Sequence, residues 1–284
     1  MSAGRLVAVG LGLVLPLAAG GCGQGGAPGA GAAGPGARER TTTVTVLAAS
    51  SLTGPFTTLA RAYESDHPGV DVVLGTGSST TLAEQVAEGA PADVLATAGA
   101  AALQRLPAGT AGAGGTAEAG GTAEAAGTSG PRGPGRFTPV TVARNSLEIA
   151  TPSGNPAGVG GLADLARPGL DVVLCASTAP CGAAADAVLA RAGVRVPDPS
   201  REVDARATLA KVRLGEADAA VVYRSDVVSA GTDVQGVPIP VADNTTVDYP
   251  LVRLTDSPDA AGFAALVTGP QGRAALAAAG FTVP

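Results

Sequence analysis

The chain has 284 residues, of which 45% are hydrophobic, so it contains enough apolar side chains for one or two packed domains. Its formal net charge of −6 and its few aromatic residues, three Tyr and four Phe with no Trp, argue against a nucleic-acid partner. A single His, His67, and a single Lys, Lys211, exclude a His-rich metal site and leave few candidates for a catalytic base.

Residues 1–21 have the pattern of an export signal peptide. Arg5 supplies a positive charge, and the apolar run over residues 6–17 is too short to span a membrane as a helix. The following Ala19-Gly20-Gly21-Cys22 resembles a bacterial lipobox, although Ala19 stands where Leu is usual. In a lipobox, Cys22 would receive a lipid and become the mature N-terminus. An ordinary signal peptide that contains a cysteine is the alternative.

Residues 22–40 would then be the lipidated cysteine and a flexible tether, because the segment consists mostly of Gly, Ala and Pro. This organisation predicts an exported protein held by a lipid anchor at the outer face of the cell membrane, or a periplasmic one. Two cysteines remain, Cys175 and Cys181, six positions apart. An oxidising compartment favours a disulfide between them, with two free thiols as the alternative.

From Thr41 onward, strand and helix patterns alternate. A β-rich run over residues 43–49 precedes a helix that opens at residues 50–53 and ends before Asp66. The pattern continues with a strand over 70–74, a Gly/Ser turn over 75–80, a helix over 81–88 and a strand over 94–96. This alternation is typical of an α/β fold with a parallel sheet.

The pattern breaks over residues 107–136, where Gly-Gly-Thr-Ala-Glu-Ala occurs twice in succession, at 114–119 and 120–125. A segment of this composition cannot bury a core, so we predict a disordered surface insertion there. Regular patterns then resume. They predict strands over 140–144, 147–150, 170–174 and 219–223, and helices over 182–192, 205–214, 259–268 and 271–279.

Several predicted helices start with small or hydroxyl residues and almost no charge. These starts are Ser50-Ser51, Ser78-Ser79-Thr80, Ala179-Pro180-Cys181-Gly182 and Asp204-Ala205. A helix N-terminus presents unpaired N–H groups and the positive end of the helix dipole, and in parallel α/β sheets such ends gather where ligands bind. They could therefore hold an oxyanion together. The alternative is that each residue is an ordinary N-cap.

The order of these motifs resembles that of periplasmic molybdate-binding proteins. The resemblance covers residues 43–284 apart from the insertion. It lies in Val46-Leu47-Ala48-Ala49-Ser50-Ser51-Leu52-Thr53, Gly77-Ser78-Ser79-Thr80-Thr81-Leu82-Ala83-Glu84-Gln85-Val86, Gly89-Ala90-Pro91-Ala92-Asp93-Val94, Arg144-Asn145-Ser146-Leu147, Pro180-Cys181-Gly182, Val222-Tyr223-Arg224-Ser225-Asp226, Asp248-Tyr249-Pro250, and Gly269-Pro270-Gln271 before Gly280-Phe281.

The resemblance implies a two-lobed class II periplasmic-binding-protein fold, in which each lobe is a mostly parallel sheet flanked by helices and the ligand cleft lies between the lobes. Lobe I would comprise residues 41–140 and 243–284, and lobe II residues 141–242. The family implies a monomer without catalytic activity or cofactor, which binds molybdate, and usually tungstate, and delivers it to the membrane permease of an ABC importer.

Five site residues follow from the resemblance. Ser51 and Ser79 would donate hydroxyl and backbone N–H groups, Cys181 and Ala205 would donate backbone N–H groups, and Tyr223 would donate its hydroxyl. Cys181 stands where the family commonly has Ala, and Ala205 where it often has Val. Only the backbone N–H would contact the ligand at both positions. We therefore expect these departures to preserve binding of the metal, which is held as the molybdate oxyanion.

Other functions stay open from the sequence. Sulfate, phosphate or another tetrahedral oxyanion is the alternative within the binding class. A serine hydrolase would need a base beside Ser51 or Ser79, and only His67 exists, with no Gly-x-Ser-x-Gly motif around either serine. A purely structural lipoprotein would bind no ligand.

Overall fold

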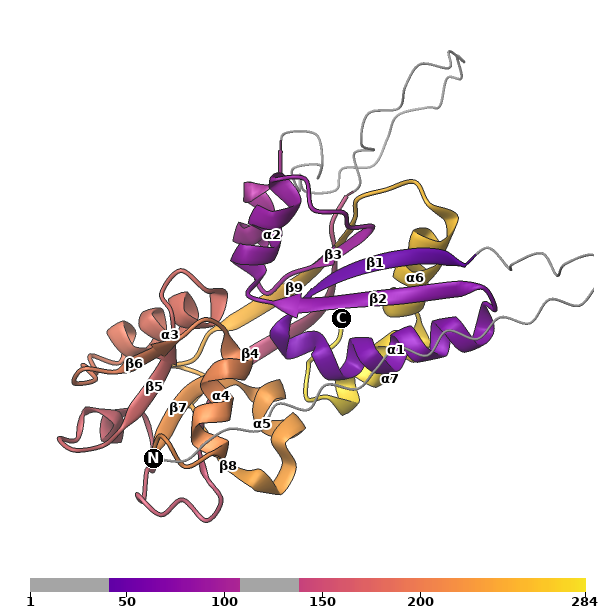
Figure 1. The fold of residues 1–284 in the computed structure, drawn as a ribbon. Helices are drawn as coiled ribbons and strands as arrows, with labels where there is room; N and C mark the ends of the chain where they lie inside the picture. The colour runs from indigo at the N-terminus through magenta and orange to yellow at the C-terminus, as the bar shows by residue number, and fades with distance from the viewer. Residues whose placement is uncertain (1–40, 108–137) are drawn as a thin grey trace, which may run out of the picture. The chain divides into compact units, whose positions relative to one another are not determined.

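The computed structural model describes residues 41–107 and 138–284 (Figure 1). The predicted signal peptide, Cys22 and the tether lie outside the described residues, as do residues 108–136 of the predicted insertion.

The described strands form one nine-stranded sheet in the order β2-β1-β3-β9-β4-β7-β5-β6, with β8 paired to β4. Their bounds are β1 Thr42–Ala49, β2 Val70–Gly77, β3 Val94–Ala96, β4 Val140–Pro152, β5 Val172–Cys175, β6 Ser200–Glu202, β7 Ala219–Tyr223, β8 Val234–Pro238 and β9 Thr246–Arg253.

Two groups of parallel strands are joined by antiparallel ones. Strand β1 pairs in parallel with β2 and β3, and β5 pairs in parallel with β6 and β7. The 13-residue strand β4 pairs antiparallel with β7, β8 and β9, and β9 pairs antiparallel with β3. Strands β4 and β9 therefore connect the two parallel groups, and the predicted α/β class is confirmed.

Seven α-helices follow these strands in the described residues. Their bounds are α1 Thr53–Asp66, α2 Ser79–Ala87, α3 Pro180–Arg191, α4 Ala205–Arg213, α5 Arg224–Ala230, α6 Pro258–Thr268 and α7 Pro270–Ala278. Short 3-10 helices occupy Ser50–Leu52, Ala100–Arg105, Leu162–Ala166 and Gly231–Asp233. Helix α1 thus follows a 3-10 turn, and α2 and α3 each begin two residues earlier than predicted.

The core lies on both faces of each parallel group. Along β1, Val46 packs in the cluster that includes Phe56 and Phe263, whose rings contact each other edge to face. The adjacent Leu47 points to the opposite face, where it packs with Leu82 of α2. This alternation is the period of two expected for a strand that is buried on both faces. In the second group, α3 packs on one face and α4 on the other (Figure 1).

Some local predictions were wrong. Gly75 and Gly77 belong to β2 and pair with β1, rather than forming a turn. A Cβ at Gly75 would lie 2.7 Å from Leu47 Cδ2, so the absence of a side chain at Gly75 of β2 leaves room for the Leu47 side chain of β1. The strands predicted over 140–144 and 147–150 are one continuous strand, β4. Strands β6, β8 and β9 and helix α5 were not predicted.

The predicted disulfide between Cys175 and Cys181 is present and buried. It connects the last residue of β5 to the second residue of α3. At the next position, a Cβ on Gly182 would lie 2.0 Å from the Ala176 carbonyl oxygen, so only glycine allows α3 to start this close to the end of β5.

Replacing both cysteines with alanine should destabilise the protein. The chain-entropy estimate for a loop this short is about 2 kcal/mol of unfolding free energy, and for a domain of this size it corresponds to a fall of roughly 4–8 °C in melting temperature. Thermal melts of the double variant and of wild-type protein with and without reductant measure the effect. Two freely titrating thiols at these positions in the unreduced wild type would contradict the pairing.

Candidate anion-binding site

A small pocket, with a cavity volume of only about 10 Å³, lies at the carboxyl ends of β2, β5, β6 and β7, where each strand leads into a helix. Its lining contains hydroxyl and small side chains and a single carboxyl group, that of Asp204. The lining residues are Ser50, Gly77, Ser78, Ser79, Ala98, Ala179, Pro180, Cys181, Asp204, Ala205 and Tyr223. None of these is Lys, Arg or His.

Three helix N-termini meet at this pocket. Ser79 is the first residue of α2, Cys181 the second of α3 and Ala205 the first of α4. The first N–H groups of a helix have no partner within that helix, and the helix dipole makes this end positive. The pocket therefore offers neutral backbone donors from three directions, an arrangement that suits an anion.

The Ser79 hydroxyl is oriented by one hydrogen bond that leaves its own O–H free to donate. Its Oγ accepts a hydrogen bond of 2.8 Å from the Ala98 N–H, and the side chain is buried. A hydroxyl oxygen that already accepts from a backbone donor keeps its own O–H to donate. Ser79 is thus oriented to donate to a group in the pocket, in addition to its backbone N–H.

Tyr223 is the last residue of β7 and is 2% exposed. Its hydroxyl has no hydrogen-bond partner among the described residues. Burial, together with the nearby Tyr249 and Asp226, raises the pKa of the Tyr223 hydroxyl well above its usual value, so the group stays protonated at neutral pH. A buried hydroxyl without a partner is energetically costly unless a ligand accepts from it.

Four of the five predicted site residues, Ser79, Cys181, Ala205 and Tyr223, line this one pocket. The fifth, Ser51, does not: its neighbour Ser50 lines the pocket instead, and Ser51 lines an adjoining open groove. Both serines lie in the 3-10 turn before α1, so successive side chains point in different directions.

Ser51 belongs to a hydrogen-bond network that sequence reasoning missed. Its Oγ lies 2.9 Å from Tyr249 Oη, and Asn145 Nδ2 donates to Ser225 Oγ at 2.7 Å and to Tyr249 Oη at 3.5 Å. These residues come from the connecting strands β4 and β9 and from the start of α5. Asn145 and Tyr249 lie in two of the motifs that resemble molybdate-binding proteins, and this position is the signal in the sequence that points to them.

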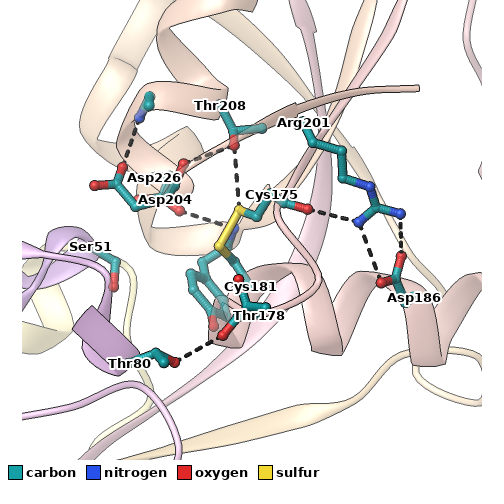
Figure 2. The surroundings of a disulfide bond; sticks show 12 residues. Ser51, Thr80, Cys175, Thr178, Cys181, Asp186, Arg201, Asp204, Thr208 and Asp226 are labelled. Carbon is teal, nitrogen blue, oxygen red and sulfur yellow. Dashed lines mark hydrogen bonds and ion pairs between the residues drawn. A yellow bond between two sulfur atoms is a disulfide. The ribbon is translucent and has the colours of Figure 1, made fainter. Parts of the chain in front are cut away.

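Two carboxyl groups stand beside the donors. Asp204 caps α4 by accepting from the Ala207 N–H at 2.9 Å, and Asp226 accepts from the Tyr223 N–H at 3.0 Å. Burial raises the pKa of Asp226 to about 7. The Tyr223 N–H opposes this shift, and the negative charge of Asp204 adds to it. Figure 2 shows both carboxyl groups next to the disulfide and Thr208.

The one histidine of the sequence lies far from the pocket serines. His67 caps the far end of α1, where its ring stacks on Tyr63 at 3.9 Å between centroids. With 14 residues in α1 at about 1.5 Å each, His67 is on the order of 20 Å from the turn that contains Ser51. This separation argues against a serine hydrolase.

Within residues 41–107 and 138–284, no cluster of three His, Cys, Asp or Glu side chains could hold a metal ion. No helix in the same ranges combines the length and apolarity needed to cross a membrane.

Residues 44–282 match the family model of bacterial extracellular solute-binding proteins, and the chain belongs to this family. It is 34% identical over 242 residues to the molybdate-binding protein ModA of Mycobacterium tuberculosis H37Rv, a match that covers 84% of each chain. The resemblance to molybdate-binding proteins is thereby confirmed at the level of sequence.

Two solved structures share the fold. The periplasmic molybdate-binding protein of Azotobacter vinelandii superposes with a TM-score of 0.62 at 19% identity, covering 85% of this chain and 99% of that one. The sulfate-binding protein SubI of M. tuberculosis H37Rv superposes with a TM-score of 0.64 at 18% identity, covering 84% and 86%. The predicted periplasmic-binding-protein fold is confirmed, and the same fold serves proteins named for different oxyanions.

The raised pKa of Asp226 predicts a pH-dependent stability. Between the ordinary Asp value of 3.8 and about 7, only the folded chain keeps the Asp226 proton. The stabilisation from this group is therefore complete below about pH 4 and is lost as the pH rises to about 7. Asp226→Asn should raise the melting temperature by a few degrees at pH 8 and change it little at pH 4.5.

Thermal melts across this range measure the effect, with Asp66→Asn, at the exposed end of α1, as the control. Equal changes for Asp226→Asn at both pH values would show that Asp226 is not the titrating group.

Proposed function

We propose that this protein captures molybdate outside the cytoplasm and delivers it to the membrane permease of an ABC importer. The observation that supports this most strongly is the buried Tyr223 hydroxyl, which has no partner and belongs to a pocket made by three helix N-termini. A dianion in that pocket would receive hydrogen bonds from Tyr223, Ser79 and the N–H groups of Cys181 and Ala205. The relative in M. tuberculosis, named a molybdate-binding protein, supports molybdate as the ligand.

A pocket of neutral donors distinguishes ions of equal charge mainly by their size and by donor geometry. Tungstate should therefore bind as well, because it is a tetrahedral dianion like molybdate. Sulfate is the second candidate, since the sulfate-binding protein SubI has the same fold. Thermal-shift measurements with molybdate, tungstate, sulfate, phosphate and chromate discriminate between them. We expect molybdate and tungstate to stabilise most. Stabilisation by sulfate alone would reassign the ligand.

We further propose that residues 41–140 with 243–284 form lobe I and residues 141–242 form lobe II, with the pocket between them. The pairing order supports this division, because β4 and β9 are the strands that connect the two parallel groups. Ser78 and Ser79 would then line the pocket from lobe I, and Cys181, Ala205 and Tyr223 from lobe II. We propose that the protein acts as a monomer anchored through lipidated Cys22.

Tyr223→Phe should separate binding from folding. The variant removes one oxygen that has no partner, so its stability should stay equal to wild type or rise by up to about 1 kcal/mol. Its affinity for molybdate should fall about 10- to 150-fold, because the lost hydrogen bond would be to a charged group. Calorimetric titration and thermal melts measure the two effects.

Tyr63→Phe is the matched control, because Tyr63 is equally buried but lies in α1 away from the pocket. Unchanged molybdate affinity in Tyr223→Phe would show that the Tyr223 hydroxyl does not contact the ligand.

Cys22→Ser should abolish lipid anchoring, because the lipid is attached through the thiol of that cysteine. The variant should appear as released or uncleaved protein in membrane fractionation and lose incorporation of a labelled fatty acid. Ala19→Leu, which restores the usual lipobox residue, should keep the wild-type anchoring. Label incorporation equal to wild type in Cys22→Ser would exclude the lipobox.

A further inference from the structure

One hydrogen bond lies beside the pocket, in a neighbouring hollow that shares Ala98, Ala179 and Pro180 with it. Thr80 Oγ1 donates to the Thr178 carbonyl oxygen at 2.9 Å, although the two residues are 98 positions apart (Figure 2). Among the described residues, no other hydrogen bond and no ion pair joins residues 42–106 to residues 153–240. Thr80 follows Ser79 directly in α2, and Thr178 lies three residues before Cys181. The bond therefore connects the two walls from which the proposed ligand donors come.

The acceptor side of this bond is rigid. Thr178 lies inside the loop closed by the Cys175–Cys181 disulfide. Within and beside that loop, the Ala179 N–H donates to the Ala176 carbonyl at 2.8 Å, and the Ala176 N–H donates to the Glu202 carbonyl at 2.7 Å.

A side chain outside the loop holds it from the other side. Arg201 donates to the Cys175 carbonyl oxygen at 2.8 Å and pairs with Asp186 of α3 at 2.8 Å (Figure 2). The Thr208 hydroxyl of α4 lies 3.4 Å from Cys175 Sγ. The position of the Thr178 carbonyl is thus fixed by a covalent bridge and by contacts to β6, α3 and α4.

We infer that the Thr80 hydroxyl and the Thr178 carbonyl form a latch that keeps the pocket closed over its ligand. This inference rests on the proposed oxyanion-binding function. Thr80 does not line the small pocket, so it would not contact the ligand and acts as a positioning residue. The bond exists only while the walls are together, and for this reason its loss should accelerate ligand release and leave ligand capture nearly unchanged.

Thr80→Val tests the latch, since valine keeps the shape of threonine and removes the hydroxyl. We expect the dissociation rate of molybdate, measured by rapid filtration of labelled ion, to rise more than about twofold and up to about tenfold, the range for one net hydrogen bond. The association rate should stay near wild type, and the melting temperature of the ligand-free protein should fall by no more than a few degrees, since one hydrogen bond is lost. Thr80→Ser, which restores the hydroxyl, should recover slow release.

Thr268→Val is the matched control, because the Thr268 hydroxyl bonds within α6, to the Ala264 carbonyl at 2.9 Å. It should release molybdate at the wild-type rate. A change of less than about twofold in Thr80→Val, or equally fast release from Thr80→Ser, would overturn the latch.

If wild-type protein fails to bind molybdate, the proposed ligand is wrong. The latch can then still be tested by hydrogen–deuterium exchange of the ligand-free protein. Hydrogen–deuterium exchange of residues 79–87 and 176–182 should be faster in Thr80→Val than in wild type and normal in Thr80→Ser. Identical exchange in all three proteins would overturn the latch independently of the ligand.

Discussion

The convergence of helix N-termini on one pocket is the constraint on which the rest of this structure depends. Strands β2, β5 and β6 each end beside the pocket and lead within a few residues into α2, α3 and α4. Parallel pairing of β5 with β6 and β7 aligns their carboxyl ends, so the helices that follow must start at the same edge. The chain thereby gathers backbone N–H groups without placing a cationic side chain in the pocket lining, and its net charge of −6 would not prevent local attraction of an anion.

A neutral site of this kind is sensitive to nearby carboxyl groups. Asp204 and Asp226 are both used to satisfy backbone N–H groups, at the start of α4 and at Tyr223. Their charge would oppose a dianion at short range. Burial raises the pKa of Asp226 to about 7, which lowers the negative charge next to the pocket at neutral pH. The same carboxyl group therefore links stability, pH and the electrostatics of the site.

Helical spacing of the apolar residues predicted α1, a β-rich run predicted β1, and a continuous apolar run predicted β7. The prediction failed where the strand pattern is interrupted. Strand β9 contains Asp248 and Pro250, and β6 has only three residues, so neither has a readable period. The lining role of Tyr223 followed from family resemblance. Whether Ser50 or Ser51 faces the pocket could not be predicted, because it depends on a single 3-10 turn. The contact of Thr80 with Thr178 joins a half-buried residue and an exposed one, and neither lies in a distinctive pattern.

The two walls of the pocket reach their geometry by different means. On one wall, the disulfide, Gly182 and Arg201 fix the start of α3 before any ligand arrives, so the Cys181 N–H needs little ordering on binding. On the other wall, the Ser79 side chain is held by one hydrogen bond from the Ala98 N–H. The residue that connects the two walls, Thr80, is placed where it can set the rate of opening without altering recognition.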